Sequence, residues 1–126
     1  MYNYPDSYDV LINVYMEKKE WNTAMDLAQK WLQIEPDSPD ANEVMSEIYA
    51  EQEKYILAIE EMKKALAIQP ADADLYFKLG QLYEKTGDNS SALNAYQKGL
   101  DWFMDDKPKN VKKKDKVLSR IKELKK

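Results

Sequence analysis

Residues 74–100, DLYFKLGQLYEKTGDNSSALNAYQKGL, carry the pattern that decides the fold. Landmarks of this stretch and of the residues before it recur in steps of 34 residues: Tyr83, Tyr49 and Tyr15; Ala92, Ala58 and Ala24; Pro70 and Pro36. A fixed period of this length is the signature of a repeat protein. Three copies of one unit therefore fill most of the chain.

The spacing within residues 74–100 resembles the tetratricopeptide repeat, a helix-turn-helix unit of the same period. The resemblance is carried by Tyr76, Leu79, Gly80, Tyr83, Gly87, Ala92, Tyr96 and Leu100. It covers residues 5–106 and implies an all-α fold, a right-handed superhelical solenoid. We expect three repeats in residues 1–106, at about 5–38, 39–72 and 73–106, and a basic seventh helix in residues 107–126.

Local signals support these helices. Ser38 and Asp72 are expected N-caps. Gly87 suits the left-handed residue that ends a helix. Lys19 and Glu53 stand at the same position of the other two repeats, so we expect turns of a different shape there. Small residues of the pattern should lie at close helix contacts; these are Ala58, Ala65, Gly80 and Ala92.

The first repeat departs from the family pattern. Ala28 and Trp31 reverse the usual order of a bulky and a small residue, which can keep the total core volume nearly constant. Ile12 also fills a position that is usually small. We interpret this repeat as an end unit.

The last helix, at about residues 110–125, is amphipathic. Its apolar residues follow helical spacing: Val111, Val117, Leu118, Ile121 and Leu124. Repeat arrays need a terminal element with one apolar face, and this helix suits that role. We expect its lysines to form a solvated outer face, because the segment has one arginine and no aromatic residue for stacking on bases. The alternative is contact with phosphates or anionic lipid through Lys112, Lys113, Lys114 and Lys116.

Charge is divided unevenly along the chain. Residues 1–106 hold 9 lysines and 21 acidic residues, a formal charge of −12, whereas residues 107–126 hold 10 basic and 2 acidic residues, a charge of +8. There is no cysteine or histidine, no glycine-rich phosphate loop and no nucleophile paired with a base. We therefore expect no enzyme activity, no cofactor and no metal site. No signal or membrane-spanning pattern is present, so a cytoplasmic location is expected, and the sequence is compatible with a segment of a longer protein.

Acidic residues form stripes beside the core face of the first helix of each repeat. In the family, these positions line a concave groove that holds extended peptides, so the resemblance implies an acidic groove. Its predicted residues are Asp9, Asn13, Glu17, Asp40, Glu43, Glu47, Glu51, Asp74, Phe77, Gln81 and Glu84.

Two interpretations of these acids stay open. Those in first turns, such as Asp9 and Asp40, stabilise the helix dipole by about 0.3–1 kcal/mol each and need no ligand. Acids later in the helices, such as Glu47 and Glu84, gain nothing of this kind, and like charges four residues apart cost about 0.2–0.5 kcal/mol. The later acids point to a ligand, and Phe77 would add an aromatic contact in the groove.

The carboxylate-clamp members of the family, which grip acidic chaperone tails, provide a specific test. Asn13 and Lys78 match their pattern. Asp9, Val44 and Asp74 stand at the other clamp positions, where two would repel a carboxylate and one cannot bind it. We therefore do not expect this chain to grip acidic chaperone tails.

We expect a protein-interaction module, an adaptor, scaffold or co-chaperone-like unit that binds a basic or mixed basic-apolar segment of a protein partner. Nucleic acid and membranes are not expected partners, and a monomer is expected rather than an oligomer. The alternative function is a structural assembly unit that self-associates through its terminal repeat faces.

Overall fold

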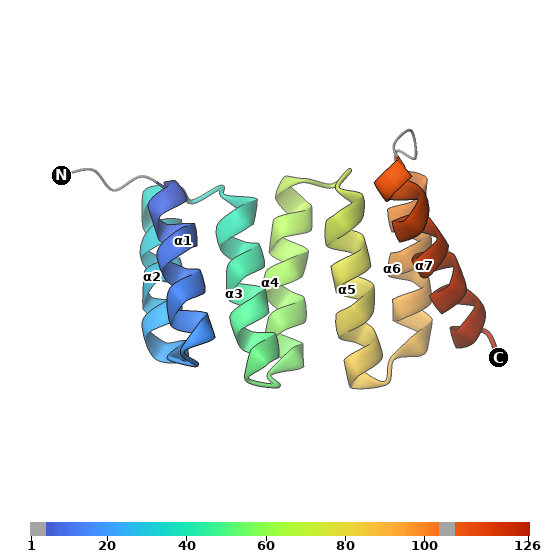
Figure 1. The fold of residues 1–126 in the computed structure, drawn as a ribbon, viewed down its shortest axis with the longest axis horizontal. Coiled ribbons are helices and arrows are strands. Elements are labelled where there is room, and N and C mark those ends of the chain that lie inside the picture. The colour runs from blue at the N-terminus through green and yellow to red at the C-terminus, as the bar shows by residue number, and fades with distance from the viewer. Residues whose placement is uncertain (1–4, 104–107) are drawn as a thin grey trace. The chain divides into compact units, whose positions relative to one another are not determined.

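A computed structural model describes residues 5–103 and 108–126 of the chain. These residues form seven α-helices and no strand (Figure 1). The helices are α1 (Pro5–Glu17), α2 (Trp21–Ile34), α3 (Pro39–Glu51), α4 (Tyr55–Ile68), α5 (Ala73–Thr86), α6 (Asn89–Asp101) and α7 (Pro108–Leu124). The predicted all-α helical-repeat fold is confirmed, whereas the right-handed twist of the array stays a prediction.

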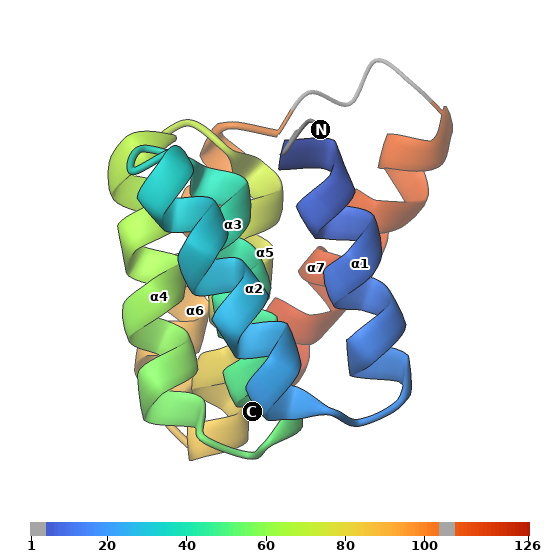
Figure 2. The ribbon, with the colours of Figure 1, turned by 90° about the vertical axis from the view of Figure 1, so that its left-hand side faces the viewer.

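The chain divides into two compact units, Met1–Ile68 with α1 to α4 and Gln69–Lys126 with α5 to α7. Within each unit, consecutive helices form antiparallel pairs joined by tight turns. Figures 1 and 2 both show this arrangement for α1 and α2. The predicted repeat limits stay predictions, and the predicted boundary between residues 106 and 107 lies outside the described residues.

Capping side chains fix where several helices begin. The Ser38 Oγ accepts a hydrogen bond from the Ala41 N–H at 3.2 Å, and the Asp72 Oδ1 accepts one from the Leu75 N–H at 3.2 Å. Both residues are extended, as an N-cap requires, so both predicted caps are confirmed. Asp88 caps α6 in the same way, through the Ser91 N–H.

The turns within the three helix pairs share one backbone conformation. Gly87 has φ 81°, as predicted for a residue that ends a helix in the left-handed region. Lys19 and Glu53 have φ 61° and 60°. The expectation that their turns differ in shape was wrong: both residues adopt the left-handed backbone conformation because the geometry of the helix pair requires it.

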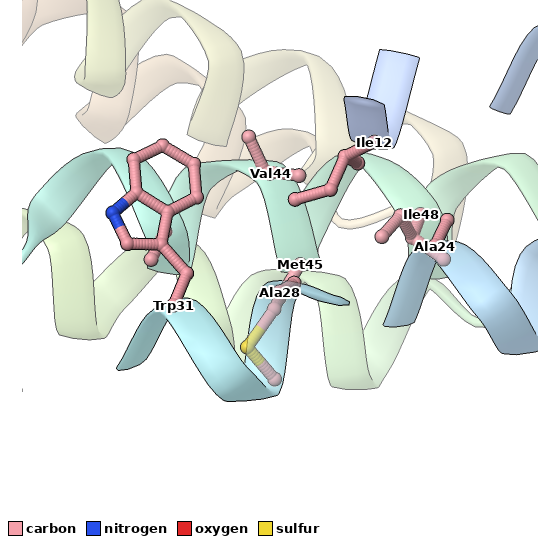
Figure 3. Packing of buried hydrophobic residues seen from close by; sticks show 8 residues of the cluster. Ile12, Ala24, Ala28, Trp31, Val44, Met45 and Ile48 are labelled. Carbon is pink, nitrogen blue, oxygen red and sulfur yellow. The ribbon is translucent and has the colours of Figure 1, made fainter. Parts of the chain in front are cut away.

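In unit Met1–Ile68, α1, α2 and α3 close around one apolar cluster (Figure 3). Ile12 is fully buried in it, and so is Ala28. Trp31 supplies the bulk that Ala28 lacks, and its Nε1 donates to the Glu35 Oε2 at 3.0 Å. Ala28 and Trp31 lie in the same core, which is consistent with the predicted compensation of volume between them.

The pair formed by α3 and α4 places small residues at its contact. Ser46 is buried, and its Oγ donates to the Ala58 carbonyl oxygen at 2.7 Å. This bond satisfies a hydroxyl that would otherwise be costly to bury. Ala58 and Ala65 are fully buried, as predicted.

In unit Gln69–Lys126, glycines let aromatic rings approach the opposite helix. A Cβ on Gly80 would lie 2.5 Å from the Tyr96 ring, and a Cβ on Gly99 would lie 2.4 Å from the Phe77 ring. Both glycines are buried. The small-against-large packing of α5 and α6 therefore depends on the missing side chains.

Helix α7 covers this second core. Val117 and Ile121 are buried against Phe77, Ala92 and Tyr96, and Leu124 packs beside them. The predicted capping role is confirmed for these residues. It was wrong for Leu118, which is 45% exposed because it lies outside the face that meets α5 and α6. The side chain of Val111 lies outside the described residues.

We predict that Gly80→Ala lowers the free energy of unfolding by about 1–3 kcal/mol, because the added methyl group overlaps the Tyr96 ring. Alanine is the better helix former, so propensity alone would give the opposite sign. Urea unfolding measures the change. With Leu in place of Tyr96, the loss of stability caused by Gly80→Ala should be much smaller, because the ring that the methyl group overlaps is absent. An equal loss from Gly80→Ala with Tyr or Leu at position 96 would contradict the packing argument.

A second prediction concerns α7. Ile121→Ala should cost about 2–5 kcal/mol, because it leaves a cavity in the core. Leu118→Ala, the matched control on the same helix, should change stability by no more than about 0.5 kcal/mol. Similar effects of the two substitutions on thermal unfolding would mean that α7 does not hold its position in solution.

Candidate functional site

The acidic face of unit Met1–Ile68 lies on α1 and α3. Asp9, Asn13 and Glu17 are exposed on α1. The four acids of α3 recur every three or four residues and therefore share one face of the helix; they are Asp40, Glu43, Glu47 and Glu51. Asp40 and Glu51 are exposed, and the two acids between them are half-buried. Each of the two helices thus presents the polar stripe that the sequence predicts.

The corresponding face of unit Gln69–Lys126 lies on α5 and differs from the prediction. Asp74 and Gln81 are exposed, but Phe77 is only 6% exposed. Its ring lies against Gly99, and its centroid lies 5.5 Å from the centroid of the Phe103 ring. Phe77 is therefore a core residue, and its prediction as an exposed anchor was wrong because α7 lies over it.

Helix α7 also pairs with the two acids at the ends of this face. The Lys113 Nζ lies 2.6 Å from the Asp74 Oδ1, near the start of α5. The Arg120 guanidinium pairs with the Glu84 carboxylate, in the last turn of α5. The earlier cation meets the earlier acid, so α7 runs in the same direction as α5 (Figure 1).

Glu84 is the best-connected acid of the face. Its carboxylate accepts hydrogen bonds from the Tyr96 hydroxyl and from Arg120. Partial burial raises the pKa of Glu84, but these two bonds outweigh burial and leave the pKa below its usual value. Burial raises the pKa of Tyr96, and the hydrogen bond to the carboxylate raises it further. Glu84 is therefore held as a carboxylate between the core and α7.

The contact between α5 and α7 leaves a hollow of about 570 Å³. It is lined by Phe77, Gln81, Glu84, Lys85, Tyr96, Lys113, Lys116, Val117 and Arg120. Apolar surface from Phe77 and Val117 lies here beside charges of both signs. The hollow can accept a larger apolar side chain than the valine that borders it.

Sequence reasoning missed three residues of this site: Tyr96, Lys113 and Arg120. Lys113 and Arg120 lie seven residues apart, so they flank the apolar face of the same helix, and Arg120 is the one arginine in the sequence. That spacing was the available signal. Tyr96 is named in the sequence analysis only as a position of the repeat pattern, and its hydroxyl reaches Glu84 because α6 packs on α5.

Within residues 5–103 and 108–126, no three His, Cys, Asp or Glu side chains come together as a metal ion requires. Among the helices described, none has the length and apolarity needed to cross a bilayer.

Comparison with known proteins identifies the repeats. The sequence model described as "TPR repeat" matches residues 47–87, and the one described as "Tetratricopeptide repeat" matches residues 73–103. Residues 47–103 therefore carry tetratricopeptide repeats. A search of curated protein sequences gives no match to it.

Solved structures share the tetratricopeptide-repeat fold at low sequence identity. The type III secretion chaperone SycD of Yersinia enterocolitica, in complex with a peptide of the translocator YopD, is 12% identical with a TM-score of 0.84; the match covers 95% of this chain and 91% of SycD. The Sgt2 TPR domain of Aspergillus fumigatus is 23% identical with a TM-score of 0.76; the match covers 94% of this chain and 80% of the Sgt2 domain. The first TPR of Spaghetti (RPAP3), bound to the HSP90 peptide SRMEEVD, is 15% identical with a TM-score of 0.72; the match covers 93% of this chain and 92% of the Spaghetti chain. These likenesses confirm the fold.

We predict that Glu84 makes stability depend on pH in a defined direction. Its pKa is lower in the folded protein than the value of 4.5 expected without partners. Its contribution is therefore fully present above about pH 4.5 and is lost as the pH falls through the folded-state pKa. The difference in unfolding free energy between wild type and Glu84→Gln should shrink from pH 6 towards pH 3 in urea titrations.

The control is Glu60→Gln, which makes the same change of charge at an exposed position of α4. If the unfolding free energies of the wild type and of Glu84→Gln differ by the same amount from pH 6 to pH 3, the bonds from Arg120 and Tyr96 to Glu84 do not form in solution.

Proposed function

We propose that this chain is a protein-interaction module whose acidic helix faces bind a basic or mixed basic-apolar segment of a partner. The faces are those of α1, α3 and α5, with the predicted residues Asp9, Asn13, Glu17, Asp40, Glu43, Glu47, Glu51, Asp74, Gln81 and Glu84. Phe77 lies beneath α7 and borders the hollow between α5 and α7.

The observation that carries this proposal is the contact between α5 and α7. The acidic face of α5 takes a helix that offers two cations and two buried apolar residues, Val117 and Ile121. A partner segment with the same chemistry would meet the same acids. Opposite charges across such a contact contribute more to the rate and specificity of association than to affinity.

The acids late in α3 add support. Glu47 and Glu51 lie in the second half of a helix, where the dipole disfavours negative charge. The last turn of α3 contains no basic residue. The helix dipole does not favour acids at these positions, and a cationic ligand would be attracted to them.

The known complexes are consistent with a peptide ligand. SycD binds a peptide of YopD, and the first TPR of Spaghetti binds an acidic HSP90 peptide. In this chain, Asp9 and Asp74 stand where the carboxylate-clamp pattern needs basic or amide groups. We therefore assign it a ligand of the opposite charge.

We predict that the double variant Glu47→Lys/Glu51→Lys loses selectivity for basic peptides. In selections from a random peptide display library, the wild-type chain should enrich sequences rich in Lys and Arg, because the acid faces create a negative potential. Enrichment should weaken with added salt, since the screening length is about 8 Å at physiological ionic strength.

The matched control is Asp26→Lys/Glu60→Lys, which makes the same change of charge at exposed positions of α2 and α4. The control should select basic peptides as the wild type does. Circular dichroism verifies that both variants stay helical. Equal enrichment by wild type and Glu47→Lys/Glu51→Lys would refute the proposed role of the α3 face.

A second candidate function is self-assembly, for which α1 supplies an observation. Val10 is 67% exposed and Val14 is 41% exposed, one helical turn apart, with Leu11 beside them. Such a patch is typical of a surface that meets another chain. Molar mass that rises with concentration, and returns to the monomer value in Val10→Asp/Val14→Asp, would favour this function.

A further inference from the structure

We infer that α7 is an internal ligand of the α5 face, and that a partner helix with the same pattern of cations and apolar residues binds there by displacing it. This inference rests on the proposed function. It adds the chemistry of the partner segment that binds unit Gln69–Lys126. It also identifies α7 as the element that covers the α5 face when no partner is bound.

The contacts of α7 exceed what a cap needs. A cap needs an apolar face, which Val117 and Ile121 provide. In addition, Lys113 and Arg120 meet the two predicted acids of the binding face, Asp74 and Glu84. These pairs fix both the direction and the register of α7 along α5.

The same contacts hold α7 lightly. The Lys113–Asp74 pair is exposed on both sides and contributes little to stability, whereas the Arg120–Glu84 pair is exposed only on the arginine side. Leu118 points away from the core, and a hollow remains beside Val117. A helix held by two buried residues, the partly buried Leu124, one exposed ion pair and one partly buried ion pair is within reach of competition by a ligand.

The hollow specifies a better ligand. It borders Phe77 and Tyr96 on α5 and α6, and Val117 on α7. A leucine at the position of Val117 would extend into it and remove more apolar surface from water. The partner is therefore an amphipathic basic helix with a lysine, a leucine-sized residue four positions later, an arginine three positions after that, and an apolar residue beside the arginine.

The first experiment compares binding of one labelled probe to variants of the full chain. The probe is a synthetic peptide of residues 108–126 that carries Val117→Leu. In the chain, Lys113→Glu/Arg120→Glu should release α7 and leave the acids of α5 in place. Because apparent affinity scales with the fraction of open molecules, this variant should bind the probe at least about tenfold tighter than wild type.

The matched control is Lys112→Glu/Lys122→Glu, which changes the net charge by the same amount at exposed positions of α7. It should bind the probe less than about threefold more tightly than wild type, since it keeps both ion pairs. If it gains as much affinity as Lys113→Glu/Arg120→Glu, overall charge explains the effect and the inference fails. It also fails if neither variant differs from wild type.

A second measurement needs no substitution. Amide hydrogen exchange of wild type with saturating probe should show faster exchange in residues 112–124, because the displaced α7 loses its contacts. Unchanged or slower exchange there would mean that the probe binds beside α7, which overturns displacement.

Failure of the inference can be separated from failure of the proposed function. If the probe binds all three chains equally and peptide selection still depends on Glu47 and Glu51, the acidic faces bind basic segments but α7 does not compete. If the probe binds none of the chains and the selections show no basic preference, both fail.

Discussion

Each helix pair has small residues at its contact, which let the two helices approach closely. In unit Gln69–Lys126 this constraint is most visible at Gly80, where the absent side chain leaves room for the Tyr96 ring. The close approach carries the Tyr96 hydroxyl to Glu84, which in turn binds Arg120. One packing contact in the core thus sets the geometry of the charged face above it.

The other pairs satisfy the same constraint with different residues. Ser46 occupies the position of Gly80 and turns its hydroxyl to the Ala58 carbonyl oxygen. Ile12 occupies it in the first repeat, where Ala28 is the small partner and Trp31 restores the volume. Volume is shared between two helices, so the requirement falls on the pair and not on either position alone.

The two units differ in what their acidic faces meet. On α1, the predicted polar residues Asp9, Asn13 and Glu17 are exposed. On α5, the face carries α7, which neutralises Asp74 and Glu84 and covers Phe77. The acidic body and basic tail of the sequence therefore meet, in part, within one molecule. Charge asymmetry along a chain can serve an internal contact as well as an external one.

The sequence by itself determined the repeat period, the helices, the caps at Ser38 and Asp72, and the small residues at helix contacts. These features depend on spacing within one helix pair, and local geometry fixes them. The groove residues other than Phe77 stay a prediction that the sequence supplied and the fold accommodates.

Only the tertiary structure decided whether Phe77 and Leu118 are buried and which backbone conformation the turns at Lys19 and Glu53 adopt. Whether Phe77 is exposed depends on α7, and Lys113 pairs with Asp74 across 39 residues of sequence. The left-handed turns arise because closure of a helix pair imposes a backbone that neither Lys19 nor Glu53 prefers. Helical periodicity shows which face of a helix is apolar, but it does not show which other helix comes to lie on that face.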